Sequence, residues 1–303
     1  MSERGLRFWF SSHQSARRVL GINARNLLYV HGLNPRRHFP LADDKIRTKQ
    51  TLVSARVPVP ATLAVLSNVS EVTQARPLLS EAGSFVIKPA RGRRGGGILV
   101  IGRTEGEMFI GPGGAPLSWE DLRRAMGDIL FGVHSFGRDD RVLVERRITA
   151  HPGLGALASQ GLPDVRVILL RGEPVMAMMR VPTKCSGGRA NLHQGALGVG
   201  LRLEDGMAMR CVREGEPVRS HPDTGAPVTG FTIPLWTDVI SVACRAARAL
   251  PLPYLGVDVV LTEPEGCLVM EVNVRPGLEI QNVNGRGLRH DLENTARRGS
   301  QGR

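Results

Sequence analysis

The chain has 303 residues, 42% of them hydrophobic and 4% aromatic, and a formal net charge of +12. It is long enough to form two or three lobes with buried cores, and no apolar run reaches the roughly 18 residues of a membrane-spanning helix. The scarcity of aromatic residues and the lack of a groove-reading motif argue against nucleic-acid binding. Anionic small molecules such as nucleotides account for the charge equally well.

The four cysteines, Cys185, Cys211, Cys244 and Cys267, are scattered along the chain without a Cys-x-x-Cys pair. This spacing indicates neither a zinc site nor a disulfide scaffold. The apolar stretch LRFWF near the N-terminus is too short for the core of a signal peptide. We therefore expect a cytoplasmic protein that is not inserted into the membrane.

The first half of the chain begins with helical spacing over residues 6–33, which predicts a helical N-terminal arm over residues 1–41. A second helix opens at Asp43 or Asp44 as its cap and ends before Pro58. Residues 83–102 then read as a strand, a glycine-rich loop and another strand.

The second half continues this mixture of helices and strands. A helix is expected over residues 118–131, a strand over 141–148, and a strand–turn–strand unit over 164–182. A further helix over residues 233–250 is stopped by Pro251. Because the elements follow no regular βαβ period, the predicted fold class is α+β.

Residues 257–274 carry the most informative pattern, two apolar strands joined by the turn sequence Glu263–Gly266. If the turn comprises those four residues, Asp258 lies directly opposite Glu271. Asn273 then lies on the same face, because strand side chains alternate with period two. The residues expected on the opposite, apolar face are Val257, Val259, Leu261, Met270, Val272 and Val274.

Two carboxylates directly opposite one another repel unless a positive charge lies between them. Asp258, Glu271 and Asn273 would offer three oxygen ligands, which suits Mg²⁺, with Mn²⁺ as an alternative. The competing interpretation is a solvent-facing hairpin whose polar residues merely alternate, with Val260 and Val269 on the same face. A bulge at Gly266 would shift the register and spoil the pairing.

The loop of residues 90–97 follows Lys88 at the end of a strand and contains the run Gly95-Gly96-Gly97. Glycines let backbone N–H groups approach phosphate oxygens closely, and a lysine adds a point charge. The loop is not a Walker A sequence, because the GK[ST] ending is missing. It is not a Rossmann fingerprint either, because a strand rather than a helix is expected to follow it. The alternative is a basic, flexible hairpin tip.

Arg189 and Asn191 lie two residues apart in another glycine-containing stretch, where they could contact a phosphate or a substrate carboxylate. The neighbouring His193 is more typical of a structural hydrogen-bonding residue, and we give it no chemical role.

Taken in order, these segments resemble the ATP-grasp superfamily, and more closely the α-L-glutamate ligase-like proteins related to the ribosomal protein S6 modification enzyme. The resemblance covers about residues 40–285. It depends on DDKIRTKQ, FVIKPARGRRGGG, VLVERRI, DVRVILL with AMMR, GRANLHQGA, GVDVVL and MEVNVRPGLE. It implies two α+β subdomains that clasp ATP, over residues 42–150 and 151–285. Residues 286–303 would then be a basic, disordered tail.

The resemblance also assigns nucleotide contacts. It implies that Lys45, Lys88 and the loop glycines Gly95 and Gly96 bind ATP phosphates. It places Glu145 and Arg146 on the strand that lines the adenine pocket, and Asp164 where a nucleotide-contacting carboxylate is expected.

For the remaining site, the resemblance implies that Asp258, Glu271 and Asn273 hold Mg²⁺. Arg189 and Asn191 would lie near the triphosphate and the acyl substrate. Arg180 and Arg275 would be partners for a phosphate or a substrate carboxylate.

Two features depart from the family pattern. Only about 40 residues precede Asp43, whereas the ribosomal modification enzyme has a larger N-terminal domain that helps to shape its acceptor site. VERRI also places arginines where related ligases carry an acidic–aromatic pair.

The function implied is an ATP- and Mg²⁺-dependent carboxylate–amine ligase that works through an acyl phosphate and adds glutamate or another amino acid to a carboxylate acceptor. One alternative is an ATP-grasp phosphotransferase that forms no amide. Another is a nucleotide-binding module that acts through a partner. Relatives are often encoded beside a membrane protein, so the resemblance makes a membrane-protein partner conceivable.

Overall fold

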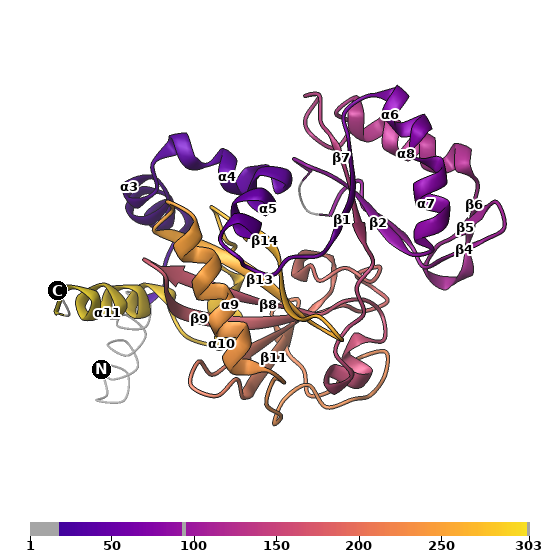
Figure 1. Ribbon diagram of the computed structural model, residues 1–303. Helices are drawn as coiled ribbons and strands as arrows, with labels where there is room; N and C mark the ends of the chain where they lie inside the picture. Colours follow the sequence, from indigo (N-terminus) through magenta and orange to yellow (C-terminus); the bar gives the residue numbers. More distant parts are fainter. Residues whose placement is uncertain (1–17, 93–94, 302–303) are drawn as a thin grey trace, which may run out of the picture. The chain divides into compact units, whose positions relative to one another are not determined.

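The computed structural model describes residues 18–92 and 95–301 (Figure 1). The chain divides into two compact units. Unit 1 takes in the chain up to Ala42, Thr51–Pro58 and Ala150 onward, and unit 2 consists of Asp43–Gln50 and Val59–Thr149. The described part of the N-terminal arm, residues 18–41, which we expected to be separate, groups with unit 1, and the arm's first 17 residues lie outside the described ranges.

Unit 2 contains a four-stranded antiparallel sheet of order β1-β7-β2-β3 and a small sheet of order β4-β5-β6. Phe85, Ile87 and Val144 of the larger sheet pack with Leu122 and Met126 of a helix. The strands are β1 (Thr62–Leu66), β2 (Phe85–Pro89), β3 (Leu99–Ile101), β4 (Arg103–Glu105), β5 (Met108–Ile110), β6 (Pro116–Leu117) and β7 (Val142–Arg146).

The helices of unit 2 are α6 (Val69–Gln74), α7 (Arg76–Ala82) and α8 (Trp119–Leu130), with a 3₁₀ turn at Pro112–Gly114. Helix α8 matches the prediction over residues 118–131. It begins at a capping box in which Ser118 and Asp121 each bond the backbone of the other.

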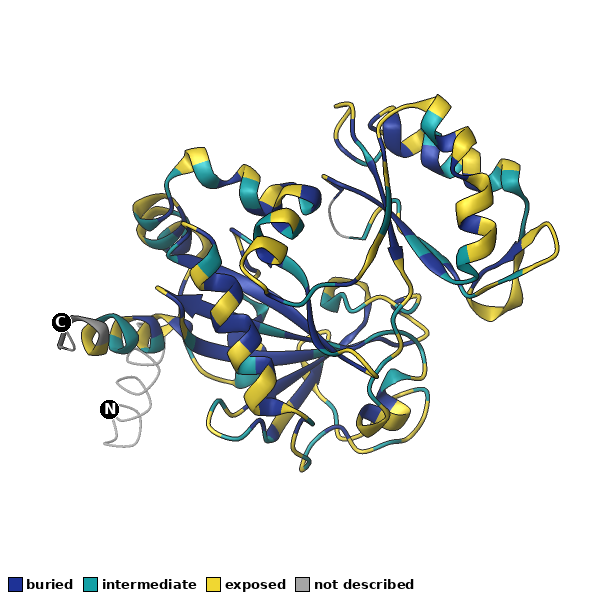
Figure 2. Cartoon of the chain, viewed as in Figure 1, coloured by how far each residue is buried: buried dark blue, intermediate teal, exposed yellow. Residues whose placement is uncertain are grey.

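Unit 1 contains a seven-stranded sheet of order β12-β11-β10-β9-β8-β13-β14, in which every neighbouring pair is antiparallel. All nine residues of β13 are buried, so this strand runs through the core (Figure 2). The strands are β8 (Asp164–Leu170), β9 (Glu173–Val181), β10 (Leu197–Leu201), β11 (Ala208–Arg213), β12 (Glu216–Pro217), β13 (Tyr254–Thr262) and β14 (Gly266–Asn273). The predicted α+β class is confirmed.

Two helices cover opposite faces of this sheet. Helix α9 (Trp236–Ala249) packs on β13 and β14. Burial, with the charge of Asp238 on this helix, raises the pKa of the thiol of Cys267, which pairs with Leu261 on the apolar face. Helix α10 (Glu279–Asn284) lies over β10, because a Cβ on Gly198 would meet Val283. Short 3₁₀ helices occur at Pro152–Ala158 and Leu192–Gln194.

The C-terminal residues correct one expectation. We predicted a disordered tail over residues 286–303, but Leu288–Gln301 form helix α11, which packs on β9. Leu288 and Leu292 are both 0% exposed, so one apolar turn of the helix holds this basic segment on the sheet.

The described part of the N-terminal arm is helical, as predicted, and it is held by side-chain amides. Asn34 both donates to the carbonyl of Tyr254 (2.6 Å) and accepts from its N–H (2.9 Å). Gln281 makes the same pair of bonds with Leu20. The elements of the arm are α2 (Ile22–Ala24), a π-helical turn (Arg25–Val30), α3 (His31–Leu33), a 3₁₀ turn (Arg36–His38) and α4 (Pro40–Asp43). They are followed by α5 (Lys45–Ser54), whose residues up to Gln50 belong to unit 2.

Among the residues that the structure describes, no helix is both long and apolar enough to cross a membrane.

Candidate functional site

The β13–β14 hairpin brings Asp258 directly opposite Glu271, as the sequence predicted, but by a different route. The turn is one residue shorter than expected, because Thr262 pairs with Gly266. A bulge then follows, since Asp258 pairs with Glu271 while Val259 pairs with Val269. The extra residue, Met270, restores the register that the shorter turn would otherwise have shifted.

This bulge corrects the predicted faces of β14. Val269, which we expected on the polar face, pairs with Val259 and is 2% exposed. Met270, which we expected on the apolar face, is the inserted residue of the bulge and is skipped in the pairing of β14 with β13. Asn273 lies opposite Gly256, so it remains on the face of Asp258 and Glu271.

Charged side chains extend from this hairpin across two more strands. Arg166 of β8 pairs with Asp258 of β13. Asp164, two residues earlier on β8, pairs with Arg180 of β9. Because alternate residues share a face, one polar row crosses β9, β8, β13 and β14.

The row is joined by charge-assisted hydrogen bonds. Arg166 donates to both oxygens of Asp258, from Nε at 2.7 Å and from Nη2 at 2.6 Å. Arg180 grips Asp164 in the same way, with both bonds at 2.6 Å, and also donates to Oδ2 of Asp258 at 2.8 Å. Asn273 donates to that oxygen at 3.2 Å. Such forked pairs fix the geometry as well as the charge.

The two aspartates respond to burial in opposite ways. Burial alone would raise the pKa of Asp258, but the guanidinium groups of Arg166 and Arg180 overcome it and hold the pKa below its ordinary value. Burial raises the pKa of Asp164, against the opposing effect of Arg180, and the nearby charge of Asp258 adds to the rise. Asp258 is therefore held ionised.

The row fits a divalent cation. No group of three His, Cys, Asp or Glu side chains that could hold a metal occurs in the described ranges, so the donors would be two carboxylates and one amide. In the described structure Oδ1 of Asp258 accepts one hydrogen bond, which leaves it a lone pair. Asp258, Glu271 and Asn273 lie on one face of the hairpin and would supply the oxygen donors that Mg²⁺ prefers.

Arg166 was missed by the sequence reasoning. The sequence could have indicated Arg166, because it lies two residues after Asp164 and both therefore lie on one face of a strand. Its partner Asp258 lies 92 residues away, and only the pairing of β8 with β13 brings them together.

Unit 2 carries a second charged cluster around Glu145, which is 4% exposed on β7. Lys88 of β2 lies 2.5 Å from one carboxylate oxygen, and Lys49 of α5 bonds the other. Lys45, one turn before Lys49, donates to the carbonyl of Gly92 in the glycine-rich loop at 2.8 Å. Sequence reasoning missed Lys49, although its i, i+4 spacing from Lys45 placed both on one helix face.

Glu145 therefore acts as the counter-ion of two lysines in this structure. Burial would raise its pKa, but Lys88 and Lys49 outweigh that effect and lower the pKa. Burial also lowers the pKa of Lys49, which the charge of Glu145 partly offsets. Arg146, the next residue on the strand, is exposed.

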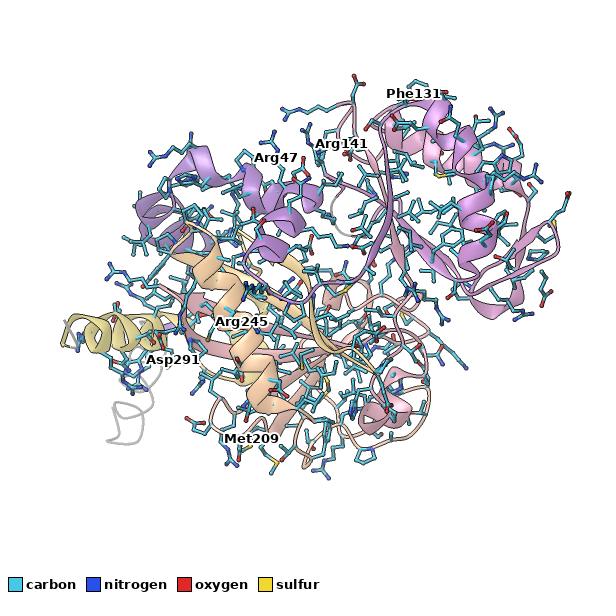
Figure 3. The ribbon with its side chains drawn as sticks, viewed as in Figure 1. Arg47, Phe131, Arg141, Met209, Arg245 and Asp291 are labelled. Atoms are coloured by element: carbon cyan, nitrogen blue, oxygen red, sulfur yellow. The ribbon has the colours of Figure 1, made fainter. Side chains whose placement is uncertain are left out.

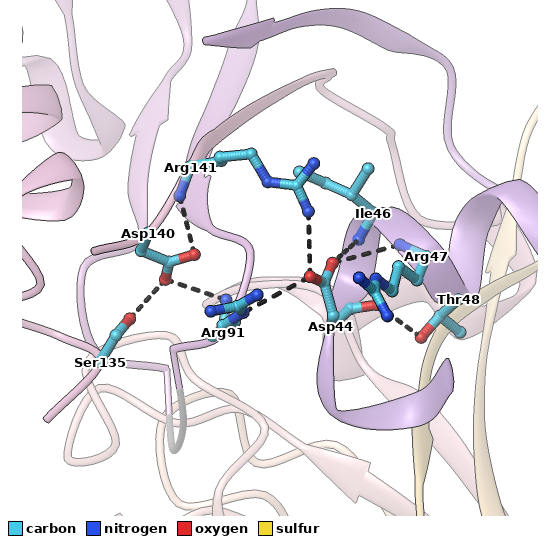
Figure 4. A network of polar contacts seen from close by, with 8 residues as sticks. All are labelled: Asp44, Ile46, Arg47, Thr48, Arg91, Ser135, Asp140 and Arg141. Atoms are coloured by element: carbon cyan, nitrogen blue, oxygen red, sulfur yellow. Dashed lines mark hydrogen bonds and ion pairs between the residues drawn. The ribbon is translucent and has the colours of Figure 1, made fainter. Parts of the chain in front are cut away.

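Two buried aspartates anchor the base of the glycine-rich loop (Figure 4). Asp44 caps α5 by accepting from the N–H groups of the residues two and three positions on, and its other oxygen meets the guanidinium groups of Arg141 (3.0 Å) and Arg91 (3.5 Å). Asp140 accepts from the N–H of Arg91 at 3.0 Å and from the hydroxyl of Ser135. The predicted cap is thus Asp44.

Within the loop itself, Gly95 has φ of 75° and Gly97 has φ of 72°. A Cβ on Gly97 would lie 2.5 Å from the ring of His134, so glycine is required at this close approach. Gly96 lies between them in the same turn.

The remaining predicted residues have other contacts. Arg189 is exposed in the loop between β9 and β10, and Asn191 accepts from the N–H of His193 at 3.1 Å as the cap of a 3₁₀ turn. The guanidinium of Arg275 lies 4.8 Å from the ring centre of Phe39. None of the hydrogen bonds or ion pairs recorded among residues 18–92 and 95–301 joins these three to Asp258.

Comparison with known families gives an independent view of the whole chain. The family model described as sugar-transfer associated ATP-grasp matches residues 24–297. The chain is also similar to a probable α-L-glutamate ligase of Mannheimia succiniciproducens, with 25% identity over 249 residues. The match covers 82% of this chain and 60% of that protein, so the chain spans about three fifths of this relative's length.

Similar solved structures include a biotin carboxylase from Campylobacter jejuni in complex with β,γ-ATP (TM-score 0.54, 18% identity, covering 90% of this chain and 51% of that one). The biotin carboxylase domain of Hydrogenobacter thermophilus 2-oxoglutarate carboxylase gives a TM-score of 0.53 at 19% identity, covering 87% and 48%. The D-cycloserine synthetase DcsG gives 0.50 at 17% identity, covering 88% and 73%. These likenesses confirm the ATP-grasp fold that the sequence resemblance implied.

Proposed function

Because the chain belongs to the sugar-transfer associated ATP-grasp family, we propose that it is an ATP- and Mg²⁺-dependent ligase that joins a carboxylate to an amine through an acyl phosphate. The relative described as a probable α-L-glutamate ligase supports glutamate as the first amine to test.

The observation that carries the proposal is the pairing of Asp258 with Glu271 in a row that also contains Asn273. These three side chains would hold Mg²⁺, which when bound neutralises charge on the phosphate oxygens during transfer. Arg166 and Arg180 keep Asp258 ionised and fix its orientation.

The lysines of unit 2 supply the opposite charge. Lys49 and Lys88 pair with the carboxylate of Glu145, and Lys45 donates to the carbonyl of Gly92 in the glycine-rich loop. They would stabilise the negative charge of the triphosphate and of the phosphoryl group in transfer.

In the proposed reaction, an oxygen of the substrate carboxylate attacks the γ-phosphorus, and the bond to the β,γ-bridging oxygen breaks to release ADP. The amine then attacks the acyl carbon, loses a proton, and expels inorganic phosphate. No side-chain nucleophile is required, because the protein's part is to position the reactants and exclude water.

The test is phosphate release from the purified chain with ATP and Mg²⁺, across pairs of carboxylates and amines, with mass spectrometry of the products. Release that needs both partners, with a product mass of one condensed pair, is expected. Release with an acceptor but no amine would indicate the phosphotransferase alternative, and ATP binding without release under every pairing would indicate a binding module.

A matched pair of variants on one hairpin makes the test specific to the site. Glu271→Gln should abolish Mg²⁺-dependent release, whereas Glu265→Gln, at an exposed position in the turn, should leave it unchanged. Normal turnover in Glu271→Gln would contradict the metal assignment.

A further inference from the structure

Arg25, in the N-terminal arm, is the only buried arginine among the residues that the structure describes, at 7% exposed. Others lie at the surface, such as Arg245 on helix α9 (Figure 3). A guanidinium is rarely buried without a carboxylate to pair with it. Arg25 instead donates to the carbonyl of Pro276 at 2.8 Å, and from Nε and Nη2 to the amide oxygen of Asn26 at 3.1 and 2.8 Å. Neither partner carries a charge that would neutralise the guanidinium.

The bond to Pro276 holds the loop that follows the metal-binding strand. Pro276 is buried three residues after the end of β14, and it packs on Gly256, where a Cβ would lie 2.8 Å from that of the proline. A Cβ on the next residue, Gly277, would lie 4.0 Å from Nη1 of Arg166, a member of the charged row. The loop that Arg25 holds therefore borders the side chains that would bind Mg²⁺.

The same loop carries Arg275, whose guanidinium lies 4.8 Å from the ring centre of Phe39. Phe39 also belongs to the arm, and the ring of His31 stacks on it with the ring centres 6.0 Å apart. The arm therefore contacts the loop at two neighbouring points, by a hydrogen bond at Pro276 and by an aromatic ring at Arg275. Arg275 itself is exposed, so its guanidinium can be reached by a ligand.

Arg25 and Arg275 are like charges held near one another. Burial lowers the pKa of Arg25, and the charge of Arg275 adds to the lowering. None of the ion pairs recorded in the described ranges includes either arginine. Because like charges repel unless an opposite charge lies near them, the pair favours an anion at Arg275, its exposed member.

The neighbouring sequence supplies few acids to this pair. Residues 18–42 contain four arginines and two histidines but no Asp or Glu, and the two aspartates that follow belong to unit 2. After Arg275 the first acid is Glu279, which accepts a hydrogen bond from an asparagine of its own helix at 2.9 Å. Before it the nearest is Glu271, on the face proposed to hold Mg²⁺. An anion that reaches this edge of the row would meet Arg275.

We propose that Arg25 is a positioning residue. Through the carbonyl of Pro276 it holds Arg275 over Phe39, ready to bind an oxyanion of the reaction, which is a carboxylate of the acceptor or a phosphate of the nucleotide. The N-terminal arm is then part of the substrate site. This inference rests on the proposed ligase function, because that reaction supplies the oxyanion.

The first test follows the NMR cross-peak of the Arg275 Nε–H group in the full chain, assigned by its loss in Arg275→Ala. In wild type, the ring of Phe39 should displace this cross-peak from those of exposed arginines. Arg25→Met should remove the displacement while the backbone cross-peaks show that the fold is kept. Arg25→Lys, which keeps a charged donor for the Pro276 carbonyl, should restore it. Arg36→Met alters an exposed arginine of the same arm and is the matched control, which should leave the cross-peak in place.

Titration of the same cross-peak identifies the oxyanion without turnover. Glutarate, a dicarboxylate that has no amine, represents the acceptor, and AMP-PNP with Mg²⁺ represents the triphosphate. One of these probes should shift the Arg275 cross-peak until it saturates. Arg25→Met should weaken the apparent affinity for that probe by about tenfold, because a displaced guanidinium no longer meets it in the bound geometry. A shift with glutarate assigns Arg275 to the acceptor, and a shift with AMP-PNP assigns it to the phosphates.

Two results would overturn the proposal. One is a cross-peak position and a probe affinity that Arg25→Met leaves unchanged, and the other is a wild-type cross-peak that neither probe shifts. If Arg25→Met does not fold, Asn26→Ala gives the same test at the surface, because it removes the bonds that hold Nε and Nη2 of Arg25. Its effects should have the same direction and be smaller, and no effect would likewise overturn the proposal.

None of these measurements needs catalysis. A chain that shows the Arg25-dependent binding but releases no phosphate would therefore contradict the ligase proposal and leave the role of Arg25 standing.

Discussion

The two charged clusters of the molecule pair their acids with different basic groups. In unit 1, three carboxylates face two arginines along adjacent strands. In unit 2, Lys49 of a helix and Lys88 of a strand pair with Glu145, while Lys45 donates to the carbonyl of Gly92. The acids of the first cluster are therefore held by forked guanidinium groups, and the acid of the second by ammonium groups.

This difference matches what each cluster is proposed to bind. Guanidinium groups make forked, fixed contacts that hold a carboxylate in one orientation. Lysines are flexible point charges, which follow the oxygens of a phosphate chain without a fixed angle. We expect the arginine cluster to be the more sensitive to substitution.

The largest effect is expected from Arg180→Met, which leaves the half-buried Asp164 and the buried Asp258 without the guanidinium that both share. The free energy of unfolding should fall by about 3–5 kcal/mol, because an uncompensated buried charge is costly. Urea unfolding measures this. Arg202→Met is the control, since Arg202 makes a similar forked pair with Asp205 at the surface and should cost less than about 1 kcal/mol. Equal losses would contradict the comparison.

Glu145→Gln should have a smaller effect. It removes the buried counter-ion of Lys49 and Lys88, but lysine chains can turn toward water more easily than a forked arginine pair. A loss of about 1.5–3 kcal/mol is expected in the same unfolding experiment, in the range of hydrogen bonds to charged groups. A loss larger than that of Arg180→Met would reverse our ranking of the two clusters.

The acid sensitivity of unit 2 gives a third test. The pKa of Glu145 in the folded chain lies below its ordinary 4.5, so its ionised form stabilises the fold above that pH. This contribution is lost as the pH falls from 4.5 through the lowered pKa, at about 1.4 kcal/mol for each unit by which the pKa is lowered. The difference in unfolding free energy between wild type and Glu145→Gln should therefore shrink over that window. A constant difference would show that the pKa of Glu145 is not lowered.

The smallest effect is expected from Arg275→Ala. The guanidinium of this exposed residue lies over the ring of the buried Phe39, a contact that stabilises by about 0.5–1 kcal/mol. If Arg275 also binds substrate, as the family resemblance implies, the Michaelis constant will rise while stability barely changes. An unchanged Michaelis constant would limit its role to stacking on Phe39.

The features that local pattern determines were mostly predictable from the sequence. Strand alternation and a turn were enough to place Asp258 opposite Glu271, and helical spacing located α8 and α9 within a few residues. The glycine-rich loop and its capped helix were also recognised from residue type.

The missed features depend on contacts distant in sequence or on compensating irregularities. Arg166 reaches Asp258 only through strand pairing, and Lys49 reaches Glu145 from another element. Residues 286–303 were predicted to be disordered because of their basic composition, although the spacing of Leu288 and Leu292 indicates a helix with one buried side. In the β13–β14 hairpin, the sequence could not distinguish a four-residue turn from a three-residue turn followed by a bulge. Each difference changes the strand register by one residue, so both arrangements pair Asp258 with Glu271.

The compensation between the short turn and the bulge at Met270 has a consequence for recognising related chains. A hairpin with one residue fewer and no bulge would bring the same two carboxylates together, since the shorter turn alone sets that register. The number of residues that separates the two acids along the chain is therefore not a fixed signature. Alignments of distant homologues should allow a one-residue gap between them, placed inside the second strand rather than in the turn.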